Sequence, residues 1–212
     1  MIFYLNGKRV ELHDADPDIT LLEYLRSVGL TSVKKPCGEG GCGGCAVAVA
    51  RYDRIRQRVH HFAVNSCLIP LPFIDGCSVT TAEGVGYGDH LHRIQQDLAK
   101  NHGTQCGFCS PGIVTTLYAL FAENPERTLE EIDEALSTNI CRCTGYRPIF
   151  DAARRYAIDY KKEALGNLML EQNEDIEESI ISTKEHPLVT AEFPEELINL
   201  KEEPVLLSTE EN

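Results

Sequence analysis

Hydrophobic and polar residues alternate along the first part of the chain as they do in strands. The stretch IFYLNGKRVEL predicts two short strands around Asn6-Gly7, a dipeptide that favours a tight hairpin turn. Three later stretches, AVAVARY, HHFAVNSC and CSVTTAE, have the same strand-like character. After the hairpin, TLLEYLRSVGL carries a leucine stripe at helical spacing, with Thr20 and Glu23 placed as a capping box. Residues 1–84 are therefore predicted to form a small α+β domain.

From Gly86 onward the hydrophobic period becomes that of helices. The stretches that fit are DHLHRIQQDLAKNHG, SPGIVTTLYALFAENP, TLEEIDEALS and RPIFDAARRYAIDYKKEA. Asp89 would cap the first helix and Gly103 would end it, whereas Ser110 would cap the second. Thr128 and Glu131 are placed as a capping box at the start of the third. Helices of this length predict a compact four-helix bundle over residues 86–165.

Residues 166–212 are predicted to be an acidic linker or tail. The last part of the chain, residues 160–212, holds 4 lysines, no arginine and 14 acidic residues, which accounts for most of the net charge of -13. Such a composition buries too little apolar surface to fold by itself. EFPEELINL, residues 192–200, is the piece that could dock locally.

Charge and hydropathy exclude several classes of protein. The body of the chain is nearly balanced in charge, so it lacks the basic face that nucleic-acid binding requires. No apolar run is long enough to span a membrane, and the N-terminal sequence lacks the form of a secretory signal. We therefore expect a cytoplasmic protein with no nucleic-acid or membrane partner. In that reducing compartment, its nine cysteines are expected to bind metal rather than to form disulfides.

The first cysteine group consists of Cys37, Cys42 and Cys45 in one glycine-rich loop, with Cys67 further along. This spacing is the plant-type ferredoxin arrangement for a 2Fe–2S cluster. The five glycines of the loop suit it to wrap a cluster, because its amides must approach the sulfur atoms closely. Zinc held by four thiolates is the stronger alternative, and four buried structural cysteines are a weaker one.

The second cysteine group consists of Cys106, Cys109, Cys141 and Cys143, in QCGFCSPG and NICRCTGYRP. These cysteines lie at the ends of predicted helices, and helix N-termini favour anionic thiolates. By itself the pattern is compatible with zinc, with a redox disulfide, or with iron and sulfide. The first group favours iron and sulfide here, because two clusters in adjacent domains form a relay.

The stretches CGEGGCGGC, NSCL, QCGFCSPG and NICRCTGYRPI, in this order, resemble the iron–sulfur region of the molybdenum hydroxylases, the xanthine dehydrogenase and aldehyde oxidase family. The resemblance covers roughly residues 1–165. It implies a ferredoxin-like β-grasp domain over residues 1–84 and a four-helix bundle domain over residues 86–165, each with one 2Fe–2S cluster.

The same resemblance implies a role in electron transfer within an oxidoreductase. In the family, electrons pass from a molybdopterin centre through both clusters to FAD, and the helical cluster lies nearer molybdenum. Gln105 matches the glutamine that contacts the pterin, and Cys143 matches the ligand that approaches the pterin edge. No catalytic residue is expected in this chain.

The resemblance also implies partners, because no FAD-binding or molybdopterin-binding sequence precedes residue 212. We expect such domains or subunits to join this chain in a dimeric or larger complex, with the chain being a fragment, a truncated product or one subunit. EFPEELINLK resembles the segment that leads to the FAD domain in single-chain relatives. The alternative hypothesis is a zinc-stabilised structural or interaction module without redox activity.

Overall fold

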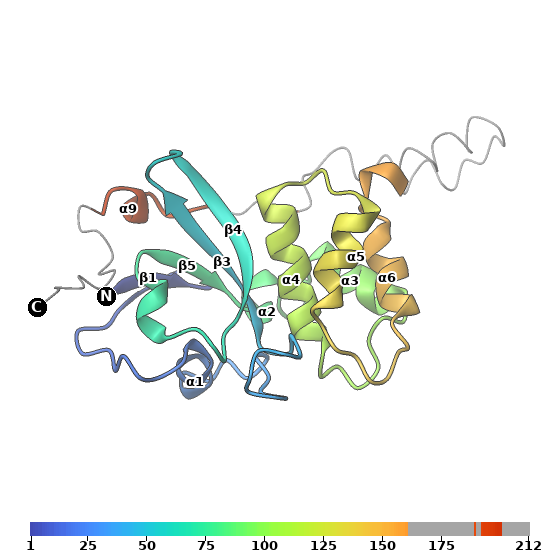
Figure 1. Cartoon of the computed structure of the whole chain (residues 1–212), viewed down its shortest axis with the longest axis horizontal. Helices are drawn as coiled ribbons and strands as arrows, with labels where there is room; N and C mark the ends of the chain where they lie inside the picture. Colours follow the sequence, from blue (N-terminus) through green and yellow to red (C-terminus); the bar gives the residue numbers. More distant parts are fainter. Residues whose placement is uncertain (161–188, 190–191, 201–212) are drawn as a thin grey trace, which may run out of the picture.

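The computed structural model describes residues 1–160, 189 and 192–200 of the chain. A five-stranded sheet forms one half of this part, and a group of helices lies beside it (Figure 1). The fold therefore contains both α and β elements, segregated along the chain as predicted. None of the described helices combines the length and the apolar character that crossing a bilayer requires.

The sheet has the strand order β2-β1-β5-β3-β4, so the last strand in sequence lies at its centre. Its strands are β1 (Ile2–Leu5), β2 (Lys8–Glu11), β3 (Ala46–Asp53), β4 (Arg58–Asn65) and β5 (Cys77–Thr80). β1 and β5 run parallel, and the other neighbouring pairs are antiparallel. Helix α1 (Leu21–Ser27) lies below the sheet in Figure 1, and a short 3-10 helix, η1 (Leu71–Ile74), precedes β5. Phe3, Val49 and Val79 are fully buried in the core that the sheet shares with α1.

The predicted hairpin and the end of the last strand show how local chemistry sets these elements. Asn6 and Gly7 have φ values of 50° and 76°, the left-handed conformation that an Asn-Gly turn favours. CSVTTAE was predicted to be strand throughout, but the chain leaves the sheet after Thr80 and forms α2 (Ala82–Val85). The Asn6 side chain causes this change, because it accepts from the Thr81 amide at 2.9 Å and donates to the Thr81 hydroxyl at 3.0 Å.

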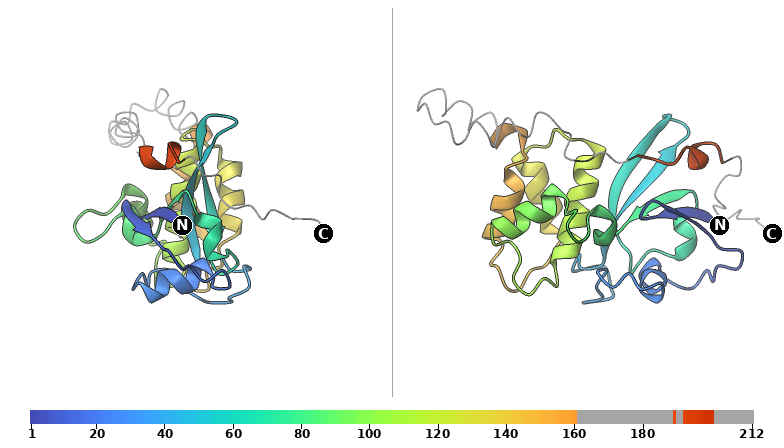
Figure 2. Two further views of the ribbon diagram at one scale, coloured as in Figure 1. Left: turned by 90° about the vertical axis from the view of Figure 1, so that its left-hand side faces the viewer. Right: turned by 180° about the vertical axis from the view of Figure 1, so that it is seen from behind.

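All four predicted helices are present, and they pack around a second hydrophobic core. The helices are α3 (Arg93–Lys100), α4 (Ser110–Glu123), α5 (Leu129–Ser137) and α6 (Arg147–Arg154). Thr128 and Glu131 form the predicted capping box at the start of α5. Figure 2 shows α4 nearest the sheet, with α3, α5 and α6 behind it.

The predicted caps of α3 and α4 were wrong, by three residues and by one residue. α3 is capped by His92 and not by Asp89, because the His92 ring nitrogen accepts from the Ile94 amide at 3.2 Å. α4 is preceded by Cys109 at the cap position, so Ser110 is its first residue. Pro111 still lies in the first turn, where its missing N–H costs no hydrogen bond.

The fourth predicted helix is interrupted. α6 ends at Arg154, the chain turns over residues 155–157, and it is helical again from Ile158, whose amide donates to the Arg127 carbonyl at 2.8 Å. This turn buries Tyr156, whose hydroxyl donates to the buried Asp97 carboxylate of α3. The remainder of the predicted helix, residues 161–164, lies outside the described residues.

Helix α4 joins the two halves, because it packs directly on β3 and β4. Glu123, at its C-terminal end, accepts from the His61 amide at 2.7 Å and contacts the His60 ring at 3.1 Å and Arg58 at 3.3 Å. Partial burial raises the pKa of Glu123, but the His61 amide and the two side chains outweigh it and hold that pKa below its usual value. The contribution of Glu123 to stability is therefore present above the ordinary glutamate pKa and is lost as the pH falls below it.

We expect Glu123→Ala to lower the stability of the protein by about 1–3 kcal/mol at pH 7, because the His61 amide loses its partner. The measurement is the temperature at which the visible absorption of the metal-loaded protein is lost, which should fall by about 5 °C. Glu126→Ala, at an exposed position in the following loop, is the matched control. Equal transition temperatures for the two variants would contradict this assignment.

Part of the predicted tail docks on the sheet. Residues 192–200, named the strap, include the short helix α9 (Glu195–Ile198), on the side of the sheet away from α1 (Figures 1 and 2). The Glu196 carboxylate accepts from Arg9 at 2.8 and 3.1 Å and from the Tyr4 hydroxyl at 2.8 Å. Leu197 is buried. EFPEELINL therefore docks locally as predicted, and the rest of the predicted tail, residues 166–188, 190–191 and 201–212, lies outside the described residues.

Candidate metal centres

The glycine-rich loop holds its cysteines through backbone conformations that other residues rarely adopt. Gly40 and Gly43 have φ values of 77° and 68°. Gly40 also lies under Leu68, whose Cδ1 would be 2.2 Å from an added Cβ. The loop is fastened to the end of β4 by Asn65, whose side-chain amide donates to the Gly40 carbonyl at 2.8 Å. The glycines predicted to shape this loop therefore do so by conformation and by close packing.

The four cysteines of the first group meet as two pairs. The Sγ atoms of Cys37 and Cys42 are 3.2 Å apart, and the thiols of Cys45 and Cys67 interact with each other. Cys42, Cys45 and Cys67 are buried, whereas Cys37 is exposed. The group therefore has one edge open to solvent and one edge inside the protein.

The protein shifts the cysteine pKa values in opposite directions at the two edges of the first group. The Glu39 amide donates to the Cys37 sulfur at 3.5 Å, and this contact with other amides of the loop lowers the pKa of Cys37 to about 7. Burial raises the pKa of Cys45 to about 11. Amide donors thus stabilise a thiolate at the open edge, while the buried edge requires a bound cation to stabilise its charge.

The second group also meets as two pairs, Cys106 with Cys143 and Cys109 with Cys141. Cys109 is the residue before α4, and burial raises its pKa to about 12. Burial also opposes ionisation of Cys141, but contacts from Thr144 and nearby amides outweigh it and lower the pKa. Cys106 and Cys143 are exposed, so this group too has one open edge.

Paired thiols suit a two-iron cluster better than a single ion. In a 2Fe–2S cluster the four cysteine thiolates are shared between two irons, whereas a zinc ion gathers all four around one point. Among the described residues, no three or more Cys, His, Asp or Glu side chains are grouped so that they could hold one metal ion. The eight cysteines of the two groups are free thiols that meet in pairs, an arrangement that fits a 2Fe–2S cluster in each group.

The two groups are joined by hydrogen bonds across the junction of the two halves. The Ile140 amide donates to the Cys42 carbonyl at 2.9 Å, and Ile140 directly precedes Cys141. The Asn139 side chain donates to the Gly43 carbonyl at 3.0 Å, and Thr115 of α4 donates to the Ala46 carbonyl at 2.7 Å. The buried edge of the first group thus contacts the loop that carries the second.

These junction residues were not predicted from the sequence. Asn139 is buried although it is polar, and Gly112 lies so close to Gly43 that an added Cβ would be 2.2 Å from its carbonyl oxygen. Both lie in the stretches that carry the second cysteine group, QCGFCSPG and NICRCTGYRP, but nothing in those stretches indicates which distant residue they contact. Gln105, in contrast, was singled out by resemblance; it lies beside Cys106 with its side chain exposed at the open edge of the second group.

Family models match both halves of the chain. The 2Fe-2S iron-sulfur cluster binding domain matches residues 3–72, and the [2Fe-2S] binding domain matches residues 81–154. Xanthine dehydrogenase/oxidase of Rattus norvegicus is 42% identical over an alignment of 217 positions, which covers 96% of this chain and 16% of the relative. Xanthine dehydrogenase of Emericella nidulans is 51% identical over 73% of this chain and 11% of the relative. The chain thus spans a small part of the length of these relatives.

Solved structures of similar fold include oxidoreductases. One is quinoline 2-oxidoreductase from Pseudomonas putida 86, which is 35% identical with a TM-score of 0.61 over 73% of this chain and 89% of the matched chain. Another is the aldehyde oxidoreductase from Desulfovibrio gigas, which is 34% identical with a TM-score of 0.63 over 72% of this chain and 16% of the matched chain.

Proposed function

The chain belongs to the molybdenum hydroxylase family as its iron–sulfur, electron-transfer part, and on this premise we propose that it carries electrons from a molybdopterin centre to FAD. When bound, each 2Fe–2S cluster would take up and release one electron. The chain itself supplies no bond chemistry in this proposal. It serves an oxidoreductase of the xanthine dehydrogenase/aldehyde oxidase type.

The proposal assigns each cysteine group to one cluster. Cys37, Cys42, Cys45 and Cys67 hold the cluster of a ferredoxin-like β-grasp domain, residues 1–84. Cys106, Cys109, Cys141 and Cys143 hold the cluster of a four-helix bundle domain, residues 86–165, and residues 166–212 are the acidic linker or tail. The pairing of the thiols and the two hydrophobic cores support this division.

The hydrogen bond from the Ile140 amide to the Cys42 carbonyl carries this proposal. It joins a ligand of one group to the residue before a ligand of the other, so a short path of covalent bonds and one hydrogen bond connects them. The ligands nearest this junction, Cys42 and Cys141, are buried, while Cys37 and Cys143 are exposed at open edges. Electrons would therefore enter and leave at the open edges and cross at the junction.

The open edges also indicate where partners dock. Phe108 and Ile140, beside the second group, are 49% and 57% exposed, and Leu68, beside the first, is 58% exposed. Apolar side chains this exposed around ligand cysteines are suited to contact another protein surface. We infer that the molybdopterin-binding domain or subunit covers Gln105 and Cys143. The FAD-binding domain or subunit covers the surface around Leu68. The assembly is a dimeric or larger complex in the cytoplasm.

Iron content and absorbance test the function directly. Protein purified without oxygen is expected to be red-brown and to hold about four irons and about four acid-labile sulfides per chain. Material loaded with zinc in place of iron is the colourless reference. A protein that stays colourless after reconstitution with iron and sulfide would refute the proposal.

A further inference from the structure

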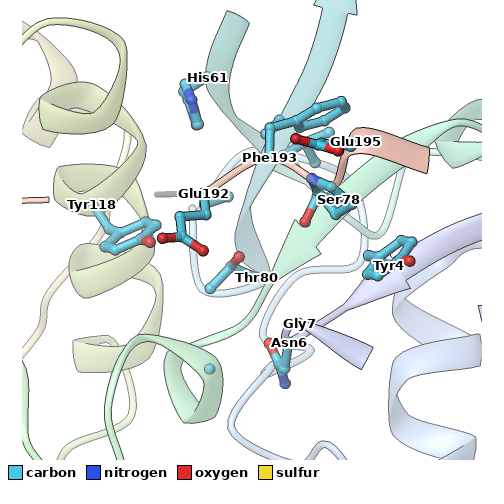
Figure 3. A pocket seen from close by; sticks show the side chains of 15 residues that line it. Tyr4, Asn6, Gly7, His61, Ser78, Thr80, Tyr118, Glu192, Phe193 and Glu195 are labelled. Carbon is cyan, nitrogen blue, oxygen red and sulfur yellow. The ribbon is translucent and has the colours of Figure 1, made fainter. Parts of the chain in front are cut away.

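A cavity of about 630 Å³ lies between the sheet, helix α4 and the strap, on the side of the sheet away from α1. Figure 3 shows its arrangement: Ser78 and Thr80 of β5 lie along one side, Tyr118 of α4 lies on another, and Glu192 and Phe193 of the strap close over it. The cavity is large enough for a small organic molecule. It is separate from both cysteine groups, since no cysteine lines it.

Most polar groups in this cavity can accept a hydrogen bond and have no partner among the described residues. Within the described part of the chain, no hydrogen bond or ion pair uses the hydroxyls of Ser78, Thr80 and Tyr118 or the carboxylates of Glu192 and Glu195. Asn6 also lines the cavity, but its side chain is bonded to Thr81. A ligand with several N–H donors would satisfy both the hydroxyls and the carboxylates, whereas a ligand that only accepts would leave the carboxylates unpaired.

The cavity is negatively charged. Among the described residues that line it there is no lysine or arginine, and the nearby Arg9 is paired with Glu11 and Glu196. His61 lines the cavity as well, but burial lowers its pKa, so it is neutral at pH 7. Two carboxylates without a positive partner in this lining therefore favour a cation.

The walls of the cavity are partly aromatic. Tyr4, Tyr118 and Phe193 come from three different elements and surround the same space (Figure 3). Burial raises the pKa of Tyr118, which keeps its ring a neutral phenol. Aromatic faces beside carboxylates attract organic cations that also have an apolar body.

We propose that this cavity binds a small organic cation that carries N–H donors on a flat or apolar body, such as an amidinium or a protonated amine. The carboxylates of Glu192 and Glu195 and the free hydroxyls of β5 and α4 hold the cationic end, and the aromatic rings hold the body. The strap, through Glu196 and Leu197, keeps the two carboxylates in place. This site goes beyond the electron-transfer function and does not depend on it.

Calorimetric titration of the full, cluster-loaded chain with benzamidine tests the proposal. Benzamidine is expected to bind, and benzoate, with the same ring and the opposite charge, is expected not to bind. The double variant Glu192→Gln/Glu195→Gln should lower the affinity for benzamidine at least about tenfold, because the charge is lost while an acceptor remains at each position. Thr80→Val, which removes one hydroxyl and leaves the strap unchanged, should lower it about threefold.

Glu134→Gln, an exposed charge change on α5, is the matched control and should bind as the parent protein does. The visible spectrum of each variant verifies that it is folded and loaded. Absence of benzamidine binding up to about 10 mM would overturn the proposal. Equal affinity for benzoate, or equal affinity in the double variant and the control, would overturn it as well.

Discussion

Replacing Cys143 by serine is expected to remove the cluster of the helical half and to leave the other cluster in place. The variant should hold about two irons per chain instead of about four. A serine hydroxyl binds iron far more weakly than a thiolate, because it stays protonated at neutral pH. Cys143 is exposed, as is its pair partner Cys106, so solvent reaches the weakened site directly.

Electron paramagnetic resonance of the reduced protein distinguishes the two clusters, and iron analysis gives their total. Cys77→Ser is the matched control, because Cys77 is fully buried in the sheet core and belongs to neither group. The control should keep both signals even if it is less stable. Two intact signals in Cys143→Ser would show that this residue is not a ligand.

The second large effect is expected from Gly112→Ala, a change that should favour a helix. Alanine stabilises a helix interior by about 1 kcal/mol relative to glycine. At this position, however, the added Cβ would be 2.2 Å from the Gly43 carbonyl oxygen, and backbone cannot move aside as a flexible side chain can. Overpacking of this kind costs about 1–3 kcal/mol, so we expect a net loss of stability. We also expect the two clusters to move apart.

Two measurements test the Gly112 prediction. The temperature at which the visible colour is lost should fall, and the magnetic interaction between the two reduced clusters should weaken. Gly41→Ala is the control: it lies in the same glycine-rich loop as Gly43 but has open space around its Cβ. A variant as stable as the parent protein, with an unchanged magnetic interaction, would show that the close contact does not hold the halves together.

Local chemistry made much of the fold predictable from the sequence. The capping boxes at Thr20 and Thr128 and the Asn6-Gly7 turn act between residues close in sequence, and all three are confirmed. The wrong predictions of helix ends arose where the structure uses less common interactions. His92 caps α3 with a ring nitrogen, a role usually filled by Ser, Thr, Asp or Asn. The end of α6 depends on Arg127 and Asp97, which are distant in sequence.

The candidate metal centres show the same difference between contacts made locally in the sequence and contacts made between distant residues. Ligand cysteines are visible in the sequence because their spacing in each motif is short and is required by the cluster. The contacts that join the two groups, from Ile140 to Cys42 and from Asn139 to Gly43, link residues about a hundred positions apart, and the motifs that contain these residues do not indicate the pairing. Only the folded chain brings them together. The cavity under the strap is hidden for the same reason, since its lining comes from β1, β3, β4, β5, α4 and residues 192–195.

The central position of β5 determines when the sheet half can be completed during synthesis. The chain through Asn65 already contains β1, β2, β3 and β4, but these form two separate hairpins until β5 arrives between them. A ribosome adds about 5–20 residues each second, so the hairpins wait for seconds with their inner edges unpaired. During this interval the edges are open to wrong pairing with other nascent chains, and a molecular chaperone would be most useful there.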